Sequence, residues 1–259
     1  MAIEIGKFAG AWEELLELLD LAFSAPWSDE QYETERRIWE QERSVVASED
    51  GQLVGHTGTF TLQLSVPGGQ LPTAGVTMVG VRPTHRRRGI LRDLMRTQLT
   101  EIHEAGEALA ALTASEPVIY PRFGYGLASD HQEIVVPKES RTLRPVAGID
   151  DVRIRYVDVR ESLPRCAELR NRLALERPGM FQHDDRWQQY TINDSLVSAA
   201  TSASKLRCVV AERDGELTGF AHYRTKRAEK GYVEVRRVHA TDLASHAALW
   251  RYLLEPDLL

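Results

Sequence analysis

Residues 81–94, "VRPTHRRRGILRDL", place three consecutive arginines at the junction between an expected strand and an expected helix. The preceding residues 73–81, "TAGVTMVGV", are typical of a strand, and Pro83 ends it because proline has no N–H group for the ladder. After the arginines, apolar residues recur at helical spacing along one face. These residues are Ile90, Leu91, Leu94, Met95, Leu99 and Ile102. The junction therefore lies between the end of an expected strand and the start of an expected amphipathic helix.

This junction is predicted to be a pyrophosphate cradle. The first N–H groups of a helix that starts near Gly89 have no intrahelical acceptors, and the helix dipole adds partial positive charge there. Gly89 has no Cβ, and Arg86, Arg87 and Arg88 supply further charge and donors. A solvated arginine run and a nucleic-acid site are the alternatives. Neither "GKS" or "GKT" nor "GxGxxG" is present, so nucleotide P-loops and dinucleotide fingerprints do not apply.

Composition limits the possible partners. The chain of 259 residues has a net charge of −6 and a pI near 5.8, which argues against general nucleic-acid binding. No apolar run has the length of a membrane helix and no basic segment leads into an apolar one, so we expect a cytoplasmic protein that does not bind membranes. Cys166 and Cys208 are expected to be buried free thiols. His183, followed by two aspartates, is expected to be a solvated histidine at a helix N-cap, and no metal site is predicted.

The first half of the chain is predicted as a strand, two helices, a three-strand meander, the helix after the arginines, and a buried strand over residues 108–115. Glu49, Asp50 and Gly51 form a hairpin turn signal in the meander. A short aromatic segment, "EPVIYPRFGYG" over residues 116–126, follows.

Two motifs in this half resemble one enzyme family. The pattern Arg86-x-x-Gly89-x-Leu91 resembles the acetyl-CoA loop of the GCN5-related N-acetyltransferases (GNAT), which usually have Gly or Ala where this chain has Leu91. Tyr120, Gly124 and Tyr125 resemble the "Y-x-x-x-G-[FY]" segment of that family. Residues 71–95, "LPTAGVTMVGVRPTHRRRGILRDLM", and 114–126, "ASEPVIYPRFGYG", are similar to the enhanced intracellular survival (Eis) branch.

The resemblance implies a fold, a cosubstrate and a set of site residues. The fold would be α+β, with tandem GNAT-like units that each have a mixed, mostly antiparallel sheet flanked by helices. Acetyl-CoA would be the cosubstrate, and Tyr120 would be the general acid. A packed aromatic side chain is the alternative for Tyr120, and Tyr125 is a nearby competitor. The residues expected to bind acetyl-CoA are Val79, Gly80, Val81, Arg87, Arg88, Gly89, Ile90, Leu91, Arg92, Ser115 and Glu116.

The acceptor implied by the resemblance is an amine of a small cationic molecule, of the aminoglycoside or polyamine kind. It would attack the thioester directly, since no "GxSxG" nucleophile motif is present. Trp27, Asp29 and Trp39 could line the acceptor pocket; the alternative is an exposed acidic helix with tryptophans in the core. Eis relatives use their terminal carboxylate as the base, to which Leu259 does not correspond. His56, His85, Glu116 or a water chain remain as candidates.

The second half repeats the first. "VVASEDGQLVGH" begins at Val45 and "VVAERDGELTGF" begins at Val209, and a strand and a helix follow in both copies. The second copy has "VHATDLASH" where the first has the arginine loop. We therefore predict a catalytic domain over 1–138, a linker over 139–150 and a second, degenerate GNAT-like domain over 151–259. The second domain is expected to be structural and to lack its final strands.

Two further expectations follow from this organisation. Eis relatives form hexamers, so a homo-oligomer is possible for this chain. The alternative to an active enzyme is a truncated or degenerate GNAT module that binds CoA or a protein partner without turnover.

Overall fold

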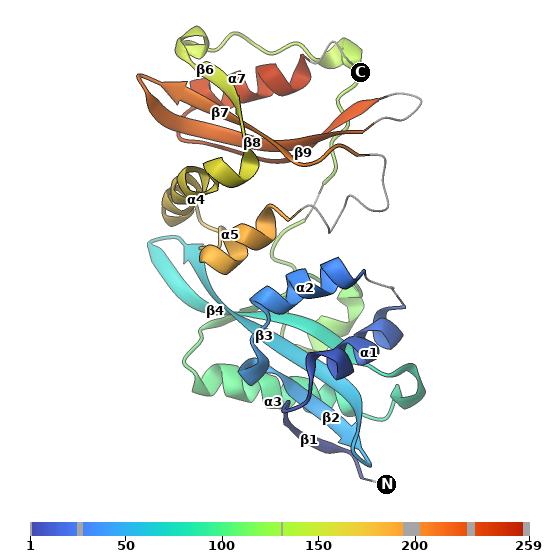
Figure 1. The fold of residues 1–259 in the computed structure, drawn as a ribbon. Coiled ribbons are helices and arrows are strands. Elements are labelled where there is room, and N and C mark those ends of the chain that lie inside the picture. Colours follow the sequence, from blue (N-terminus) through green and yellow to red (C-terminus); the bar gives the residue numbers. More distant parts are fainter. Residues whose placement is uncertain (1, 25–27, 131, 194–202, 227–230, 256–259) are drawn as a thin grey trace. The chain divides into compact units, whose positions relative to one another are not determined.

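The computed structural model describes residues 2–24, 28–130, 132–193, 203–226 and 231–255. The chain divides into two compact units (Figure 1). The first unit is Met1–Asp130 with Pro178–Gln182, and the second is His131–Arg177 with His183–Leu259. Both units combine one sheet with flanking helices, which confirms the predicted α+β class. The predicted domain boundaries, 1–138 and 151–259, stay a prediction.

The sheet of the first unit has five strands in the order β1-β2-β3-β4-β5, and only the β4–β5 pair is parallel. The strands are β1 (Glu4–Lys7), β2 (Val45–Glu49), β3 (Gln52–Val66), β4 (Gly69–Val81) and β5 (Leu109–Ala111). The helices are α1 (Trp12–Phe23), α2 (Asp29–Ile38) and α3 (Ile90–Glu104), with short 3₁₀ turns η1 (Gln41–Arg43), η2 (Pro83–His85) and η3 (Pro117–Phe123). This order of elements agrees with the order predicted from the sequence.

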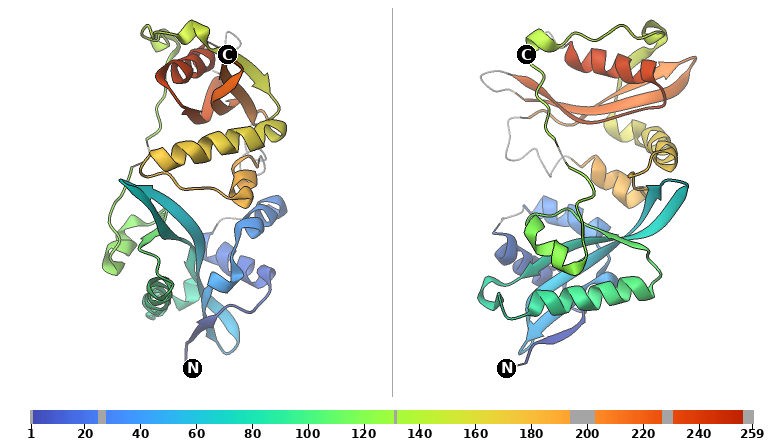
Figure 2. Two further views of the ribbon diagram at one scale, coloured as in Figure 1. Left: turned by 90° about the vertical axis from the view of Figure 1, so that its left-hand side faces the viewer. Right: turned by 180° about the vertical axis from the view of Figure 1, so that it is seen from behind.

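Helices cover both faces of this sheet, with α1 on one face and α3 on the other (Figure 2). Glycines in the strands allow both helices to approach closely. A Cβ built on Gly80 would lie 2.9 Å from the Cβ of Ala22 in α1, and one on Gly55 would lie 2.9 Å from Ile90 in α3. The apolar residues of α1 and of the start of α3 fill the two resulting cores.

The second unit has a four-stranded antiparallel sheet in the order β6-β7-β8-β9. The strands are β6 (Arg153–Val157), β7 (Arg207–Arg213), β8 (Glu216–Lys226) and β9 (Tyr232–Ala240). The helices are α4 (Val159–Glu176), α5 (Asp185–Thr191) and α7 (Leu243–Leu254), with turns η4 (Lys138–Ser140) and η5 (Ile149–Asp151). Leu169 of α4 packs with Val210 and Phe220, whereas Leu249 of α7 packs with Val209 and Ala221, so α4 and α7 cover opposite faces.

The two sequence repeats form the same hairpin in both units. Asp50 and Gly51 have φ angles of 51° and 78°, and Asp214 and Gly215 have φ angles of 52° and 85°. Positive φ at both central residues matches a two-residue turn that follows the twist of its strands, and Asp-Gly is a preferred pair for it. The predicted "EDG" turn is therefore present, and the second copy repeats it.

A segment from late in the sequence completes the first sheet. Pro178–Gln182 leaves the second unit and runs along β3. Ser65 donates its N–H group to the Met180 carbonyl over 2.9 Å, and Gly179 donates to the Ser65 carbonyl over 2.7 Å. This pairing covers the part of the β3 edge beyond β2, which would otherwise expose unpaired backbone groups.

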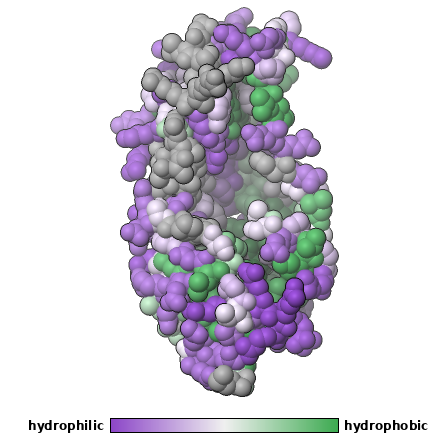
Figure 3. All heavy atoms as spheres, turned by 90° about the vertical axis from the view of Figure 1, so that its right-hand side faces the viewer, coloured by the Kyte–Doolittle hydropathy of each residue, from purple (hydrophilic) through white to green (hydrophobic). Residues whose placement is uncertain are grey.

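The surface of the protein carries mostly hydrophilic side chains on the face shown in Figure 3. Within the described residues, no helix is both long enough and apolar enough to cross a membrane.

Candidate functional site

The arginine junction has an open helix N-terminus. Gly89 precedes α3 in a left-handed conformation with φ of 85°, and no side chain caps the helix there. The first helical hydrogen bond runs from the Asp93 N–H group to the Gly89 carbonyl over 3.1 Å. The N–H groups of Ile90, Leu91 and Arg92 therefore have no acceptor within the helix. Glycine suits residue 89 because residues with a Cβ rarely adopt this φ. This conformational reason adds to the close approach of a ligand that the missing Cβ allows.

The arginines of the junction are largely held in place. Arg88 forms a two-pronged ion pair with Glu49 at the end of β2, one prong joining Arg88 Nη1 to Glu49 Oε2 over 3.1 Å. His85 Nε2 lies 2.9 Å from the same carboxylate. Arg88 and His85 together lower the pKa of Glu49 to about 2, so this carboxylate stays ionised at neutral pH. Arg87 is exposed, with φ of 63°, and makes no hydrogen bond or ion pair to a described residue.

Arg86 and Arg92 also have partners. Arg86 donates to the Ala22 carbonyl over 3.1 Å, and Arg92 pairs with Asp93 over 2.9 Å. A guanidinium has five N–H donors, so each partnered arginine keeps donors for a further oxyanion. The charge at the junction is therefore fixed in position, with Arg87 as the arginine that is freest to reach an added ligand.

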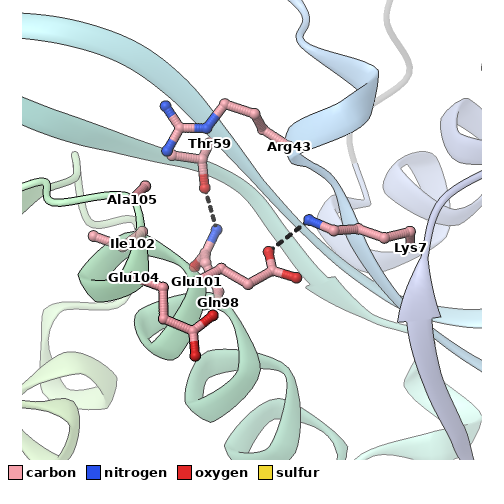
Figure 4. Close-up of a pocket in the computed structure, with 8 residues that line it drawn as sticks. All are labelled: Lys7, Arg43, Thr59, Gln98, Glu101, Ile102, Glu104 and Ala105. Atoms are coloured by element: carbon pink, nitrogen blue, oxygen red, sulfur yellow. Dashed lines mark hydrogen bonds and ion pairs between the residues drawn. The ribbon is translucent and has the colours of Figure 1, made fainter.

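The second half of α3 is pinned to the sheet, which fixes where the helix begins. Gln98 donates through Nε2 to the Gly58 carbonyl and to Thr59 Oγ1 on β3, each over 2.8 Å. Lys7 of β1 pairs with Glu101 over 2.7 Å. Figure 4 shows the Gln98–Thr59 and Lys7–Glu101 interactions beside a cavity of about 270 Å³. Lys7, Gln98 and Glu101 line this cavity and also hold α3 on the sheet. We therefore assign these side chains a structural role.

Strand β4 continues beyond its parallel neighbour. β5 pairs with β4 only at Thr73, Ala74 and Gly75, and β4 runs on to Val81. The last six residues of β4 therefore have no strand partner on the β5 side among the described residues. Val79, Gly80 and Val81 lie in this part, where an extended ligand could add along the edge in the manner of a strand.

A bulge interrupts β4 just before these residues. Between the pairs His56–Gly80 and Gly58–Thr77, Met78 and Val79 together oppose the single residue Thr57. Met78 has φ of 51°, a left-handed conformation that costs a non-glycine residue about 1–2 kcal/mol. Such strain persists only where neighbouring groups hold it.

His56 holds this bulge from the buried side. Its Nδ1 lies 2.8 Å from the Met78 carbonyl and its Nε2 lies 3.0 Å from Ser44 Oγ. Because a carbonyl only accepts, Nδ1 carries the proton, and Ser44 donates to Nε2 of the neutral ring. Ser44 in turn accepts from Trp39 Nε1 over 3.0 Å. His56 is 0% exposed, and burial lowers its pKa to about 4.

The aromatic segment after β5 places two phenols together. The rings of Tyr120 and Tyr125 meet edge to face with centroids 5.8 Å apart. Gly124, with φ of 90°, ends η3, and Tyr125 follows it directly. Tyr125 packs against the buried cluster formed by Ala74, Val76 and Ile102. The spacing of the motif therefore reflects a turn that requires glycine.

Both phenols stay protonated at neutral pH. Burial and the carboxylate of Glu116 raise the pKa of Tyr120. Burial and Tyr120 raise the pKa of Tyr125 to about 12. The hydroxyl of Tyr125 is buried without a hydrogen-bond partner among the described residues. A protonated, half-buried Tyr120 has the state that a proton donor needs.

The remaining predicted site residues are spread over the first unit. Ser115 and Glu116 are exposed on the segment that leads into η3. Asp29 is exposed in the first turn of α2. Trp39 packs against Trp12 and Phe8 with centroids 4.7 and 5.9 Å apart, the core role that the sequence left open for it. Trp27 lies outside the described residues.

In the second unit, the N-terminus of α7 is capped by a side chain, whereas that of α3 in the first unit is not. Asp242 caps α7 by accepting the N–H group of Ser245 over 2.9 Å, and Arg213 pairs with Asp242. Glu49 and Arg213 occupy the same place in the two hairpins, so the sign of the supporting charge is reversed between units. A carboxylate now takes the place that a phosphate would need, which supports the prediction that the second unit lacks a cradle.

His183 differs from its predicted role. Asp184 caps α5, as expected for this segment, by accepting the N–H group of Trp187 over 2.9 Å. His183 itself is not solvated: it stacks on Trp187 and its Nε2 lies 3.0 Å from Arg170. The expectation of a solvated histidine was wrong because the Trp187 ring and α4 enclose it. Across the described residues, no group of three or more His, Cys, Asp or Glu side chains is placed to hold a metal.

Sequence reasoning missed the residues that support the site. Glu49 and Gln98 had no assigned role, because each acts through a partner about 40 residues away. His56 was considered as a base, and its contacts instead make it a support for the Met78 bulge. For Glu49, the only local indication that it pairs with Arg88 was a negative charge next to the hairpin turn.

Comparisons with known proteins agree with this geometry. Two models described as "Acetyltransferase (GNAT) domain" match residues 9–128 and 179–259. An uncharacterized N-acetyltransferase of Streptomyces coelicolor is 42% identical over 95% of this chain and 62% of its own length. N-acetyltransferase Eis of Mycobacterium tuberculosis is 32% identical over 82% of this chain and 52% of its own length.

A solved structure shows the same arrangement of elements. The crystal structure of Eis1 from Mycobacterium abscessus superposes with a TM-score of 0.77 and 27% identity, covering 100% of this chain and 64% of that chain. The chain thus spans less than two thirds of the length of each of these three relatives.

Proposed function

Because the chain belongs to the GNAT acetyltransferase family, whose cosubstrate is acetyl-CoA, we propose that it transfers an acetyl group from acetyl-CoA to an amine. The observation that carries this proposal is the open N-terminus of α3 beside the unpaired edge of β4. The two features meet at the η2 turn, so one extended ligand with a pyrophosphate could use both.

The pyrophosphate would bind at the start of α3. The amides of Ile90, Leu91 and Arg92 lack intrahelical acceptors, and Arg87 is exposed beside them. Backbone amides and the helix dipole both favour a negative charge at this place. Glu49 holds Arg88 and offsets part of its charge, so Arg88 would supply orientation as well as attraction.

The pantetheine arm would run along Val79, Gly80 and Val81. These residues lie in the part of β4 that β5 leaves unpaired, which supports strand-like pairing of an amide-bearing arm with the backbone groups on that side. Ser115 and Glu116 lie on the segment that diverges from β4 and would line the opposite side. The bulge at Met78 would aim a backbone N–H group at the thioester oxygen, where negative charge develops during attack.

Tyr120 would donate the proton that the departing thiolate needs. Its raised pKa keeps the proton on Oη until a stronger base forms beside it. Bound acetyl-CoA supplies an activated acyl group, so the protein has to provide proximity, charge stabilisation and this proton. Tyr125 is the less suited phenol because its hydroxyl is enclosed.

The acceptor would be an amine of a small cationic molecule, consistent with the net charge of −6. Among the candidate bases, His56 is enclosed with both ring nitrogens hydrogen-bonded, and His85 is paired with Glu49. Glu116 or water is therefore the better candidate for removing the proton from the amine.

Isothermal titration of CoA tests the proposed cofactor site. The double variant Arg88→Glu, Gly89→Asp reverses the charge at the cradle and should weaken CoA binding by about 100-fold or more, as expected when several charged contacts are lost. The matched control is Arg160→Glu, Gly215→Asp. It makes the same substitutions at an exposed arginine and at a glycine with the same φ of 85° in the second unit.

Equal CoA affinity in both double variants would remove the cofactor site from the α3 N-terminus. Tight CoA binding without acetyl transfer to kanamycin-like amines, polyamines or lysine peptides would favour the alternative, a module that binds CoA without turnover.

A further inference from the structure

The second unit contains a cavity that the proposed acetyl transfer does not use. It has a volume of about 160 Å³ and lies on the face of the sheet that carries α5. Trp187 and Tyr190 of α5 form one wall. His222 and Arg224 of β8, with Arg236 and Arg237 of β9, form another wall. At about 30 Å³ for each water molecule, this volume suits a ligand of a few heavy atoms.

The lining of the cavity is strongly cationic. Arg224 is 2% exposed, and Arg237 is largely enclosed, with one hydrogen bond of 3.4 Å to the Thr191 carbonyl. Arg236 is paired with Glu234 over 2.9 Å. Among the described residues, no carboxylate lines the cavity. The only hydrogen bond of Arg237 within the described residues is to the neutral Thr191 carbonyl, and an enclosed guanidinium normally requires a negative partner, because removing a charge from water is costly.

The pKa values of several groups around the cavity are lowered, in part by the same positive charges. Burial and Arg236 lower the pKa of Arg237. Burial and Arg237 lower the pKa of Arg170, next to the cavity, to about 10. Burial, Arg170 and Arg237 lower the pKa of His183 to about 3. His183 is therefore neutral at physiological pH.

The floor of the cavity has an unused polar group. His222 is 3% exposed, and neither ring nitrogen has a hydrogen-bond partner of good geometry among the described residues, although the thiol of Cys208 lies beside the ring. Nδ1 of His183 is likewise buried without a partner. A neutral imidazole always carries one N–H donor, so an acceptor in the cavity would satisfy at least one of these rings.

The position of the cavity matches a feature of the first unit. The β8–β9 ladder shifts register between His222 and Tyr223, where Arg236 is the extra residue on β9. The β3–β4 ladder has its bulge at the corresponding stretch, at Met78. The second unit thus has a bulge at the matching place, with arginines around it, and its α7 N-terminus is capped by Asp242. These differences would remove an anion site at the helix N-terminus and create one in the cavity.

We infer that this cavity binds a small oxyanion, in the form of a phosphate group. Arg237 supplies the opposing charge, and an imidazole N–H group of His222 supplies a directed donor. The aromatic wall of Trp187 and Tyr190 limits the ligand to inorganic phosphate or a phosphate carrying one small substituent. This site is separate from the proposed pyrophosphate cradle and does not depend on it.

The test is isothermal titration with inorganic phosphate at low ionic strength. The protein carries Arg87→Met and Arg88→Met, so that the arginine junction of the first unit contributes little. We expect saturable binding of one phosphate per chain. Adding Arg237→Met should weaken binding by about 10-fold or more, as expected for a lost charge-assisted contact. Arg172→Met, at an exposed position of α4, is the matched control and should leave affinity unchanged.

Two further sets of measurements identify the class of ligand and check that the variants fold. Glycerol phosphate and a dicarboxylate of similar size replace phosphate in parallel titrations; stronger binding of the dicarboxylate would overturn the assignment to a phosphate group. Arg237→Lys keeps the charge and should bind with intermediate affinity, and circular dichroism checks that each variant folds. Absence of phosphate binding in the Arg87→Met, Arg88→Met protein would overturn the inference, as would equal affinity in the Arg237→Met and Arg172→Met variants.

Discussion

His56 Nδ1 donates a hydrogen bond to the carbonyl of Met78 over 2.8 Å, joining a buried ring on β3 to the strained bulge on β4. Ser44 and Trp39 continue this chain of hydrogen bonds away from the bulge. The proposed oxyanion-binding stretch therefore depends on side chains that lie behind the sheet. The backbone of Met78 is fixed before any ligand arrives.

Substitution of His56 tests this support. His56→Leu leaves a buried carbonyl without a donor and should lower the free energy of unfolding by about 1–3 kcal/mol. His56→Asn is the matched variant, since its amide N–H group can replace Nδ1, and should lose less. Urea denaturation measures both. Equal losses in the two variants would show that the bond to Met78 contributes little.

The same histidine predicts a pH dependence of stability. Its ordinary pKa is 6.5 and its pKa in the folded protein is about 4, so between these values the unfolded chain binds more protons than the folded one. The free energy of unfolding should therefore fall as the pH is lowered through this window. At about 1.4 kcal/mol per pH unit, His56 should account for roughly 2 kcal/mol of the loss between pH 6.5 and pH 5.

The measurement for this prediction compares urea denaturation of the wild-type protein and His56→Asn at pH 7 and pH 5. His183 and His239 also have lowered pKa values, but they contribute equally to both proteins. A loss of the same size in both proteins would contradict the assigned neutral state of His56.

Gly89 should matter for CoA binding beyond its effect on stability. Gly89→Ala and Gly215→Ala both place a side chain at φ of 85°, and each should cost about 1 kcal/mol in unfolding free energy. A Cβ on Gly89 would also lie 3.1 Å from Arg92 Nη2 at the proposed cradle, whereas one on Gly215 meets open space. Titration should show weaker CoA binding, by about 5-fold or more, only for Gly89→Ala. Unchanged affinity in both would separate Gly89 from the ligand.

The two phenols should differ in single-turnover acetyl transfer. Tyr120→Phe should leave CoA affinity nearly unchanged and slow transfer by about 100-fold or more, as expected for a lost general acid. Tyr125→Phe removes a buried hydroxyl without a partner, so it should preserve both transfer and stability. A slower rate in Tyr125→Phe than in Tyr120→Phe would exchange the roles of the two residues.

Local patterns predicted the elements and most of the candidate site. Asp-Gly turns, the helix after Gly89 and the glycine after Tyr120 follow from backbone preferences over a few residues, which a sequence displays directly. The repeat beginning at Val209 likewise indicated a second unit of the same topology. These features are determined by neighbours in the chain.

Features that depend on distant residues could not be predicted in this way. The pairing of Arg88 with Glu49, the bond from His56 to Met78 and the return of Pro178–Gln182 to β3 join segments far apart in the sequence. The cationic cavity of the second unit combines α5 with two strands that follow it. No periodicity marks such contacts, because they arise only once the sheet has formed.

A crystal structure of the protein with bound CoA tests the central proposal most directly. We expect the pyrophosphate oxygens within about 2.7–3.2 Å of the backbone nitrogens of residues 90–92, with the pantetheine arm along residues 79–81. The sulfur should lie next to Tyr120 Oη. CoA bound elsewhere on the chain, or a sulfur that reaches a cavity without Tyr120, would contradict the proposed acetyl transfer.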